Sequence, residues 1–281
     1  IVFPLSAAAQ GGEPEKKEKG YLSASFETNS IYYLKDSLSG AILPENRLGS
    51  NDYFKADYYL GNFSAGIQYE AYLPALQGYP IQLKGVGKIF KYASYSGYGF
   101  HIRIGDFYEQ LGSGLLFRSW EERSLGLNTS LEGADAGYSY RDIFSIRGFI
   151  GRPRSFMDYG SSAISGADAS LSISSLLGWN AFGLALEGSC LNKYEEPLSA
   201  DISPNATGFS ARLALNVKGL SLKGEAIRRD AYPAMYNFNS DLKGKAYLVE
   251  AQYQGRGFGA LFTFRQLQNM QWQSARSQAS S

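Results

Sequence analysis

The feature that most constrains this chain is a recurring segment of about ten residues in which apolar and polar residues alternate. In residues 63–72 the odd positions are apolar and the even positions are small or polar, and residues 209–217 repeat the pattern. A strand with this pattern has one apolar and one polar face. Arg212 falls on the polar face. Because an arginine facing lipid at mid-bilayer costs about 2–4 kcal/mol, we expect it to face an interior.

About thirteen such segments follow one another, and each is long enough to cross a membrane at a tilt. They predict an all-β fold, an antiparallel up-and-down transmembrane β-barrel. Their centres lie near Phe26, Ala56, Ile67, Ile89, Ile102, Ala136, Ile146, Leu171, Leu186, Leu213, Leu222, Val249 and Phe262.

The connections between these segments alternate between short and long. Short periplasmic turns and long external loops are typical of outer-membrane barrels, whereas a soluble β-sandwich has no reason to keep its long loops at one end. The short connections are 61–62, 95–97, 141–142, 177–181, 218–219 and 254–257. The long connections are 34–50, 73–84, 109–133, 153–162, 193–206 and 229–243.

Composition excludes several other classes of protein. The sequence has no run of about twenty apolar residues, which argues against a helical inner-membrane protein. A net charge of +1 with mixed signs argues against a nucleic-acid partner. The single cysteine, Cys190, excludes an internal disulfide and a Cys-based zinc cluster. Many tyrosines lie near segment ends, as the aromatic girdles of a barrel would require, although aromatic residues favour strands of any kind.

The two ends of the sequence differ in character from the segments between them. Residues 1–9 are apolar and close on small residues, as the remnant of a signal peptide would. Residues 10–20 are charged and predict a flexible periplasmic lead-in to a barrel at 21–267, which a polar tail at 268–281 follows. Bacterial barrels close with an even number of strands, and an open edge is unstable in lipid. We therefore expect the sequence to be a fragment of a longer outer-membrane chain.

The densest group of charged residues lies in the connection after the fifth segment, within residues 105–134. One interpretation is a loop folded into the lumen, where it narrows a pore; the other is a solvated external loop whose ion pairs contribute little. The inward loop is slightly favoured, because the apolar residues of 115–120 would otherwise be exposed together. The predicted lumen or constriction residues are His101, Arg103, Asp106, Arg118, Glu121, Glu122, Arg123 and Arg147.

The predicted lumen wall carries both signs of charge. Such a wall suits a water-filled pore of weak ion selectivity, or a barrel closed by internal salt bridges, and composition does not choose between them. The wall residues predicted from the alternation are Ser25, Glu27, Gln68, Glu70, Lys88, His101, Arg103, Arg147, Glu187, Arg212, Lys223 and Glu225.

The catalytic residue types that the sequence offers argue against an enzyme. A barrel hydrolase or protease needs a histidine next to a nucleophile or carboxylates. The only histidine, His101, alternates with Phe100 and Ile102, so it faces the lumen, and no serine lies two residues from it. We therefore predict no catalytic residue, no cofactor and no metal site.

Two stretches carry a family resemblance. The sequence GDFYEQLGSGLLFRSWEERSLGLNTSLEG at 105–133, followed by YRDIFSIRGFIGRPR at 140–154, resembles a family of outer-membrane β-barrel proteins from Bacteroidota that has no established activity. The resemblance covers most of the chain from Gly20 onward, and its specific part is residues 106–126. It implies an outer-membrane location, a barrel and a parent chain longer than this one, and it supplies no catalytic residue.

Two functions remain open at this point. The first is a passive pore for small hydrophilic solutes, with residues 105–133 as its constriction. The second is a non-conducting scaffold or binding barrel whose long loops, including the aromatic residues of 232–236, engage a partner protein or surface ligand. The expected partners are outer-membrane lipid and, for the second function, another envelope protein. The sequence predicts neither a solute nor an oligomeric state.

Overall fold

One antiparallel sheet forms almost the entire structure. The computed structural model describes residues 19–35, 38, 44–197, 199–232 and 242–270. Within these ranges the main sheet has 14 strands, and removing the two-residue strand β12 (Asp158–Tyr159) leaves thirteen long ones in chain order. The predicted up-and-down fold is confirmed. The long strands are β1 (Tyr21–Tyr32), β2 (Leu48–Leu60), β3 (Phe63–Tyr72), β4 (Gly85–Gly97), β5 (Phe100–Phe107), β10 (Leu131–Tyr140), β11 (Phe144–Ser155), β13 (Ala163–Ser172), β14 (Gly183–Tyr194), β15 (Asn205–Val217), β16 (Leu220–Arg229), β17 (Gly244–Gly255) and β18 (Phe258–Gln268).

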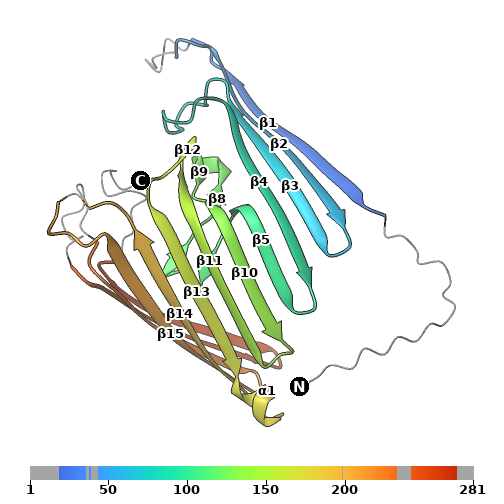
Figure 1. Ribbon diagram of the computed structural model, residues 1–281, viewed down its shortest axis with the longest axis vertical. Helices are drawn as coiled ribbons and strands as arrows, with labels where there is room; N and C mark the ends of the chain where they lie inside the picture. Colours follow the sequence, from blue (N-terminus) through green and yellow to red (C-terminus); the bar gives the residue numbers. More distant parts are fainter. Residues whose placement is uncertain (1–18, 36–37, 39–43, 198, 233–241, 271–281) are drawn as a thin grey trace.

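The sheet curls into a trough with a concave and a convex side (Figure 1). Each long strand pairs with its neighbours in sequence, so hairpin turns lie at one end of the trough and the long connections at the other. Strands β1 and β18 are the two edges of the sheet and do not pair with each other among the described residues. Among those residues, no helix is long and apolar enough to cross a membrane.

The hairpin turns follow the expected positions with two differences. Lys218–Gly219 has positive φ at both residues, as a tight two-residue turn requires. The turn predicted at 95–97 is displaced, because β4 continues to Gly97 and the positive-φ pair is Tyr98–Gly99. The connection predicted at 177–181 begins earlier, in the short helix α1 (Ile173–Leu177), which Ser172 caps.

Alternation separates the two faces as predicted. On β15, Phe209 and Leu213 are 58% and 48% exposed on the convex side. The Arg212 side chain between them is only 9% exposed and pairs with carboxylates on the concave side. The same parity holds across the strand pairs, since Arg212 lies opposite Glu187 on β14 and Glu225 on β16. The convex face is therefore apolar and the concave face polar.

Aromatic pairs mark the turn end of the convex face. The rings of Phe63 and Tyr95 lie 4.9 Å apart, and those of Phe100 and Tyr138 lie 4.6 Å apart. These pairs form part of the girdle that the sequence predicted. Not every tyrosine near a strand end belongs to it, because Tyr72 is buried on the concave side.

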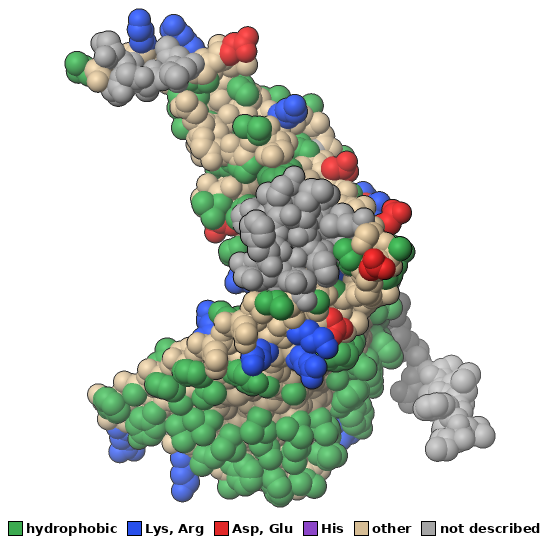
Figure 2. Space-filling model, turned by 90° about the vertical axis from the view of Figure 1, so that its left-hand side faces the viewer, with side chains coloured by type: hydrophobic (Ala, Val, Ile, Leu, Met, Phe, Trp, Pro, Cys, Tyr) green, Lys and Arg blue, Asp and Glu red, His purple; other side chains and the backbone are tan. Residues whose placement is uncertain are grey.

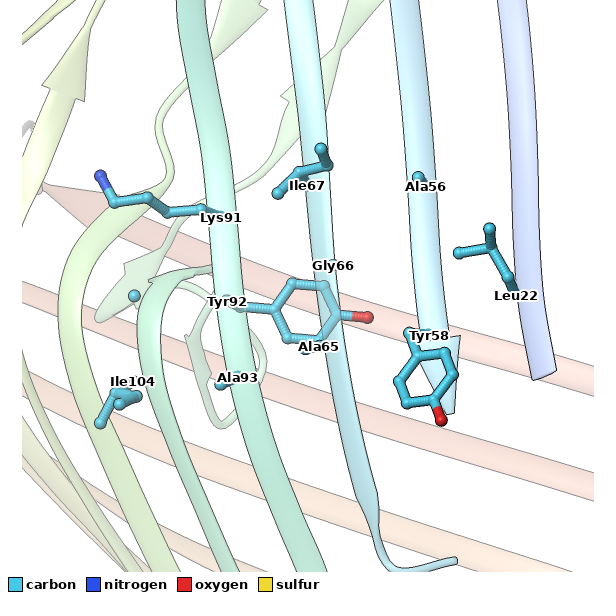
Figure 3. Close-up of a pocket in the computed structure, with 11 residues that line it drawn as sticks. Leu22, Ala56, Tyr58, Ala65, Gly66, Ile67, Lys91, Tyr92, Ala93 and Ile104 are labelled. Carbon is cyan, nitrogen blue, oxygen red and sulfur yellow. The ribbon is translucent and has the colours of Figure 1, made fainter. Parts of the chain in front are cut away.

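The convex face remains apolar where it is hollowed. A depression of about 550 Å³ lies over β1 to β5, and Gly66 and Gly105 are among the residues that line it (Figure 3). Its other lining residues are almost all apolar, and Lys91 is its one charged residue. The convex side thus suits apolar surroundings along this part of the sheet.

A new charge should cost much more stability on the convex face than on the concave face. Leu213→Lys on the convex face should lower the free energy of unfolding in phospholipid vesicles by about 2–4 kcal/mol, because it places an ammonium in lipid. The neighbouring Ala214→Lys, on the concave face, is the matched control and should cost much less. Denaturant titration of both variants measures the difference, and equal costs would show that the convex face does not meet lipid.

Candidate functional site

Residues 108–130, here called the insert, fold inside the trough rather than outside it (Figure 1). The insert contains two small hairpins, β6 (Gln110–Leu111) with β7 (Phe117–Arg118) and β8 (Glu121–Glu122) with β9 (Leu127–Asn128), and the 3-10 turn η1 (Arg123–Leu125). Gly112 has φ of 55°, a conformation that favours glycine and lets the first hairpin reverse close to the wall. The connection thus has a defined fold of its own.

Polar contacts fix one side of the insert to the first strands. Arg123 Nη1 lies 2.5 Å from Glu27 Oε2 of β1, and its Nη2 donates to Gln68 Oε1 of β3 at 3.0 Å. The same guanidinium lies 4.4 Å from the centre of the Tyr53 ring on β2. Glu121 accepts from Gln68 Nε2 at 3.0 Å. Burial lowers the pKa of Arg123, but the carboxylates of Glu121 and Glu27 outweigh burial and raise it.

Apolar contacts fix the opposite side of the insert. Leu111 and Leu116 have no exposed surface and pack with inward-facing residues of the wall. We call this group the collar; its wall members are Phe107, Leu131, Phe149, Ile164, Leu191, Ile227 and Ala246. At the insert tip, Ser113 donates its backbone N–H to Glu225 Oε2 at 3.2 Å. The insert therefore crosses the interior from β1–β3 to β14–β17.

A row of paired charges lies below the collar, toward the hairpin turns. We call it the belt; it consists of Arg103, Asp135, Arg147, Asp168, Glu187, Arg212 and Glu225 on β5, β10, β11 and β13–β16. Arg103 contacts Asp135 at 2.7 Å. Arg212 contacts Asp168 at 2.5 Å and Glu187 at 2.8 Å, with Glu225 at 3.9 Å. Three arginines are thus interspersed with four carboxylates, and ion pairs neutralise most of their charge.

A cavity of about 220 Å³ lies beside the contact between the insert tip and the belt. Gly112 and Ser113 line it from the insert, and Arg212, Lys223 and Glu250 line it from the wall. Neither Lys223 nor Glu250 forms an ion pair with another described residue. The free charges at this narrow point are therefore of both signs.

A buried ion pair anchors the long-connection end of the interior. Arg154 and Glu70 are each 1% exposed, and the guanidinium donates to both carboxylate oxygens, Nη1 at 2.8 Å and Nη2 at 2.5 Å. Tyr72 donates to the same carboxylate at 3.3 Å. Because breaking such a pair leaves an uncompensated buried charge, this contact holds β11 firmly against β3.

His101 belongs to a polar chain that the sequence did not reveal. Its Nδ1 lies 2.8 Å from Ser96 Oγ, and its Nε2 lies 3.0 Å from Asp135 Oδ1. Ser96 is five positions away in sequence but directly opposite His101 in the β4–β5 pairing. A search limited to neighbours two residues away could not find it. Arg103 Nε holds the second oxygen of the same carboxylate at 2.7 Å.

The remaining predicted site residues lie in different places. Arg147 contacts Glu109 of the insert at 2.8 Å, whereas Arg118 stacks 4.7 Å from the Trp120 ring and forms no ion pair with a described residue. Glu122 caps η1.

Asp106 lies away from the interior. Its carboxylate is buried, and it accepts from the backbone N–H of Lys91 at 2.9 Å and from the Tyr159 hydroxyl. This contact ends the β4–β5 pairing on the convex side. The side chain of Lys88 lies outside the described residues. No three His, Cys, Asp or Glu side chains gather as a metal site in the described ranges.

Glu109 provides a pH test of the docked insert. Burial raises the pKa of its carboxyl above the ordinary value, and the Arg147 guanidinium opposes the rise. A raised folded-state pKa means that this group favours folding in its protonated form, and the contribution is lost as pH rises through that pKa. The unfolding free energy of the wild type, relative to Glu109→Gln, should therefore increase between pH 7 and pH 4. Urea titration of both proteins measures it, and a decrease would contradict the buried position.

Several solved structures resemble this one at low similarity. The crystal structure of Acinetobacter baumannii OccAB4 matches with a TM-score of 0.41 and 12% identity, over 90% of this chain and 84% of that chain. A BenF-like porin from Pseudomonas fluorescens Pf-5 matches with a TM-score of 0.39 and 11% identity, over 85% of this chain and 78% of that chain. Likenesses this low carry no argument about function.

Comparison with sequences gives a firmer result. A search of curated proteins finds no significant match. Residues 1–281 match a family described as a family of unknown function, DUF6029, and the match spans the whole chain. The chain therefore belongs to the DUF6029 family.

Proposed function

We propose that this chain forms the wall of a bacterial outer-membrane pore for small hydrophilic solutes, with the insert as its constriction. The observation that carries the proposal is that the insert is docked across the charged concave face of a sheet whose convex face is apolar. An apolar outside and a polar inside suit a water-filled passage through lipid. In keeping with this location, we also propose that residues 1–9 belong to an export signal and that the source is a member of the Bacteroidota.

The belt supports a weakly selective passage. Its arginines and carboxylates are paired, so they present no strong field of either sign to a passing solute. The guanidinium of Arg118 is exposed and forms no ion pair with a described residue. It therefore supplies a positive charge on the insert that a solute would meet.

Conductance of the full protein in a planar bilayer tests the pore. Stable steps are expected, and Arg118→Gln should shift the permeability ratio toward cations, because it removes an unpaired positive charge from the constriction. Arg123→Gln should instead enlarge the steps or make them noisier, since it releases the insert from Glu27 and Gln68.

Arg256→Gln is the matched control, because Arg256 lies in the turn between β17 and β18, away from the insert. It should leave conductance and selectivity unchanged. A folded protein that conducts nothing would contradict the pore. That result would favour the second function, a non-conducting barrel that binds a partner through its long connections, with the docked insert as a plug.

We further propose that the Ser96–His101–Asp135 chain is structural and that the protein is not a hydrolase. The Arg103 guanidinium already neutralises the carboxylate that would stabilise a charged imidazole. A fluorophosphonate should therefore leave Ser96 unmodified, as intact-protein mass spectrometry would show. Covalent labelling that Ser96→Ala abolishes and Ser94→Ala retains would overturn this assignment.

A further inference from the structure

Two cations lie side by side on the convex face. Arg228 of β16 and Lys245 of β17 are paired directly opposite each other, and both are exposed. Their neighbours along the strands, Ile227 and Ala246, belong to the collar on the concave side. Alternation therefore places the two cations on the convex side. Like charges directly opposite each other in a sheet are destabilising, so this arrangement needs an explanation.

No carboxylate neutralises the pair in the described part of the chain. Arg228 and Lys245 form no ion pair there, and the nearby Asp230 accepts a hydrogen bond from the Thr207 hydroxyl. Other convex-face cations behave differently. Lys91 and Arg152 share the Glu132 carboxylate, at 3.1 Å and 2.7 Å. The Arg228–Lys245 pair thus presents positive charge that no described residue pairs with.

An exposed apolar surface adjoins the pair on the side of the hairpin turns. Its large residues are 44–58% exposed: Phe209, Leu213, Tyr247, Val249 and Phe264. The lower part of Figure 2 shows a broad hydrophobic face of this kind, bordered by Lys and Arg side chains. The pair itself lies next to the long connection 230–243, at the end of the strands that faces the cell exterior in an outer-membrane barrel.

We infer that Arg228 and Lys245 form a binding site for the phosphate of lipid A, the acylated and phosphorylated glycolipid of the outer leaflet. A guanidinium and an ammonium are both phosphate ligands, and a bound phosphate would relieve the repulsion between them. The acyl chains would then lie against the apolar surface beside the pair. The site adds a function to the barrel wall and does not depend on whether the pore conducts.

Lipid A binding to the full protein in zwitterionic phosphatidylcholine nanodiscs tests the site, with native mass spectrometry as the readout. The wild type should bind lipid A in preference to phosphatidylglycerol. Arg228→Gln with Lys245→Gln should weaken binding by about fivefold for each cation removed. Lys91→Gln with Arg152→Gln removes the same number of convex-face cations and should bind like the wild type.

Two further outcomes would overturn the inference. Equal binding of lipid A by the Arg228→Gln, Lys245→Gln protein and the wild type would exclude the pair as the site, and equal binding of phosphatidylglycerol would exclude lipid A as its specific ligand. Folding is checked without lipid A, where the double variant should be at least as stable as the wild type because the repulsion is gone. With lipid A present, only the wild type should gain stability.

Discussion

The separation of an apolar convex face from a polar concave face is the constraint on which the rest of this structure depends. It arises from strict alternation along the strands, so that Arg212 turns inward between Ala211 and Leu213, which turn outward. Once the concave face is polar, any segment that enters the trough needs partners of its own. The insert meets this requirement with unlike contacts at its two ends.

The two ends of the insert are held by different physics. Arg123 ties one end through charge-assisted hydrogen bonds to Glu27 and Gln68, which are geometrically specific. Leu111 and Leu116 tie the other end through burial in the collar, which is non-directional and tolerates small shifts. The hydrogen bonds of Arg123 on one side and the buried leucines on the other together hold the backbone of the tip at one position. The space left beside the tip is therefore a property of the fold rather than of a mobile loop.

Local patterns predicted the sheet well, because period and turn chemistry are encoded over a few residues. The strand count, the inward side of Arg212 and the Lys218–Gly219 turn all follow from such patterns. Contacts between distant segments were harder to predict. The chain from Ser96 to His101 depends on strand register, and the Arg154–Glu70 pair joins residues 84 positions apart. Asp106 was grouped with lumen residues because it lies among them in sequence, yet it ends the β4–β5 pairing on the convex side.

The distribution of unpaired charge separates structural residues from candidate functional ones more sharply than the number of charges does. The belt arginines form ion pairs with neighbouring carboxylates, so their charge stabilises the wall. Arg118 inside the trough, and Arg228 with Lys245 outside it, have no such partner among the described residues. An unpaired cation in contact with water costs little to keep, whereas two in register repel each other. The inner cation can therefore persist without a ligand, while the outer pair would gain stability from an anion that none of the described residues supplies.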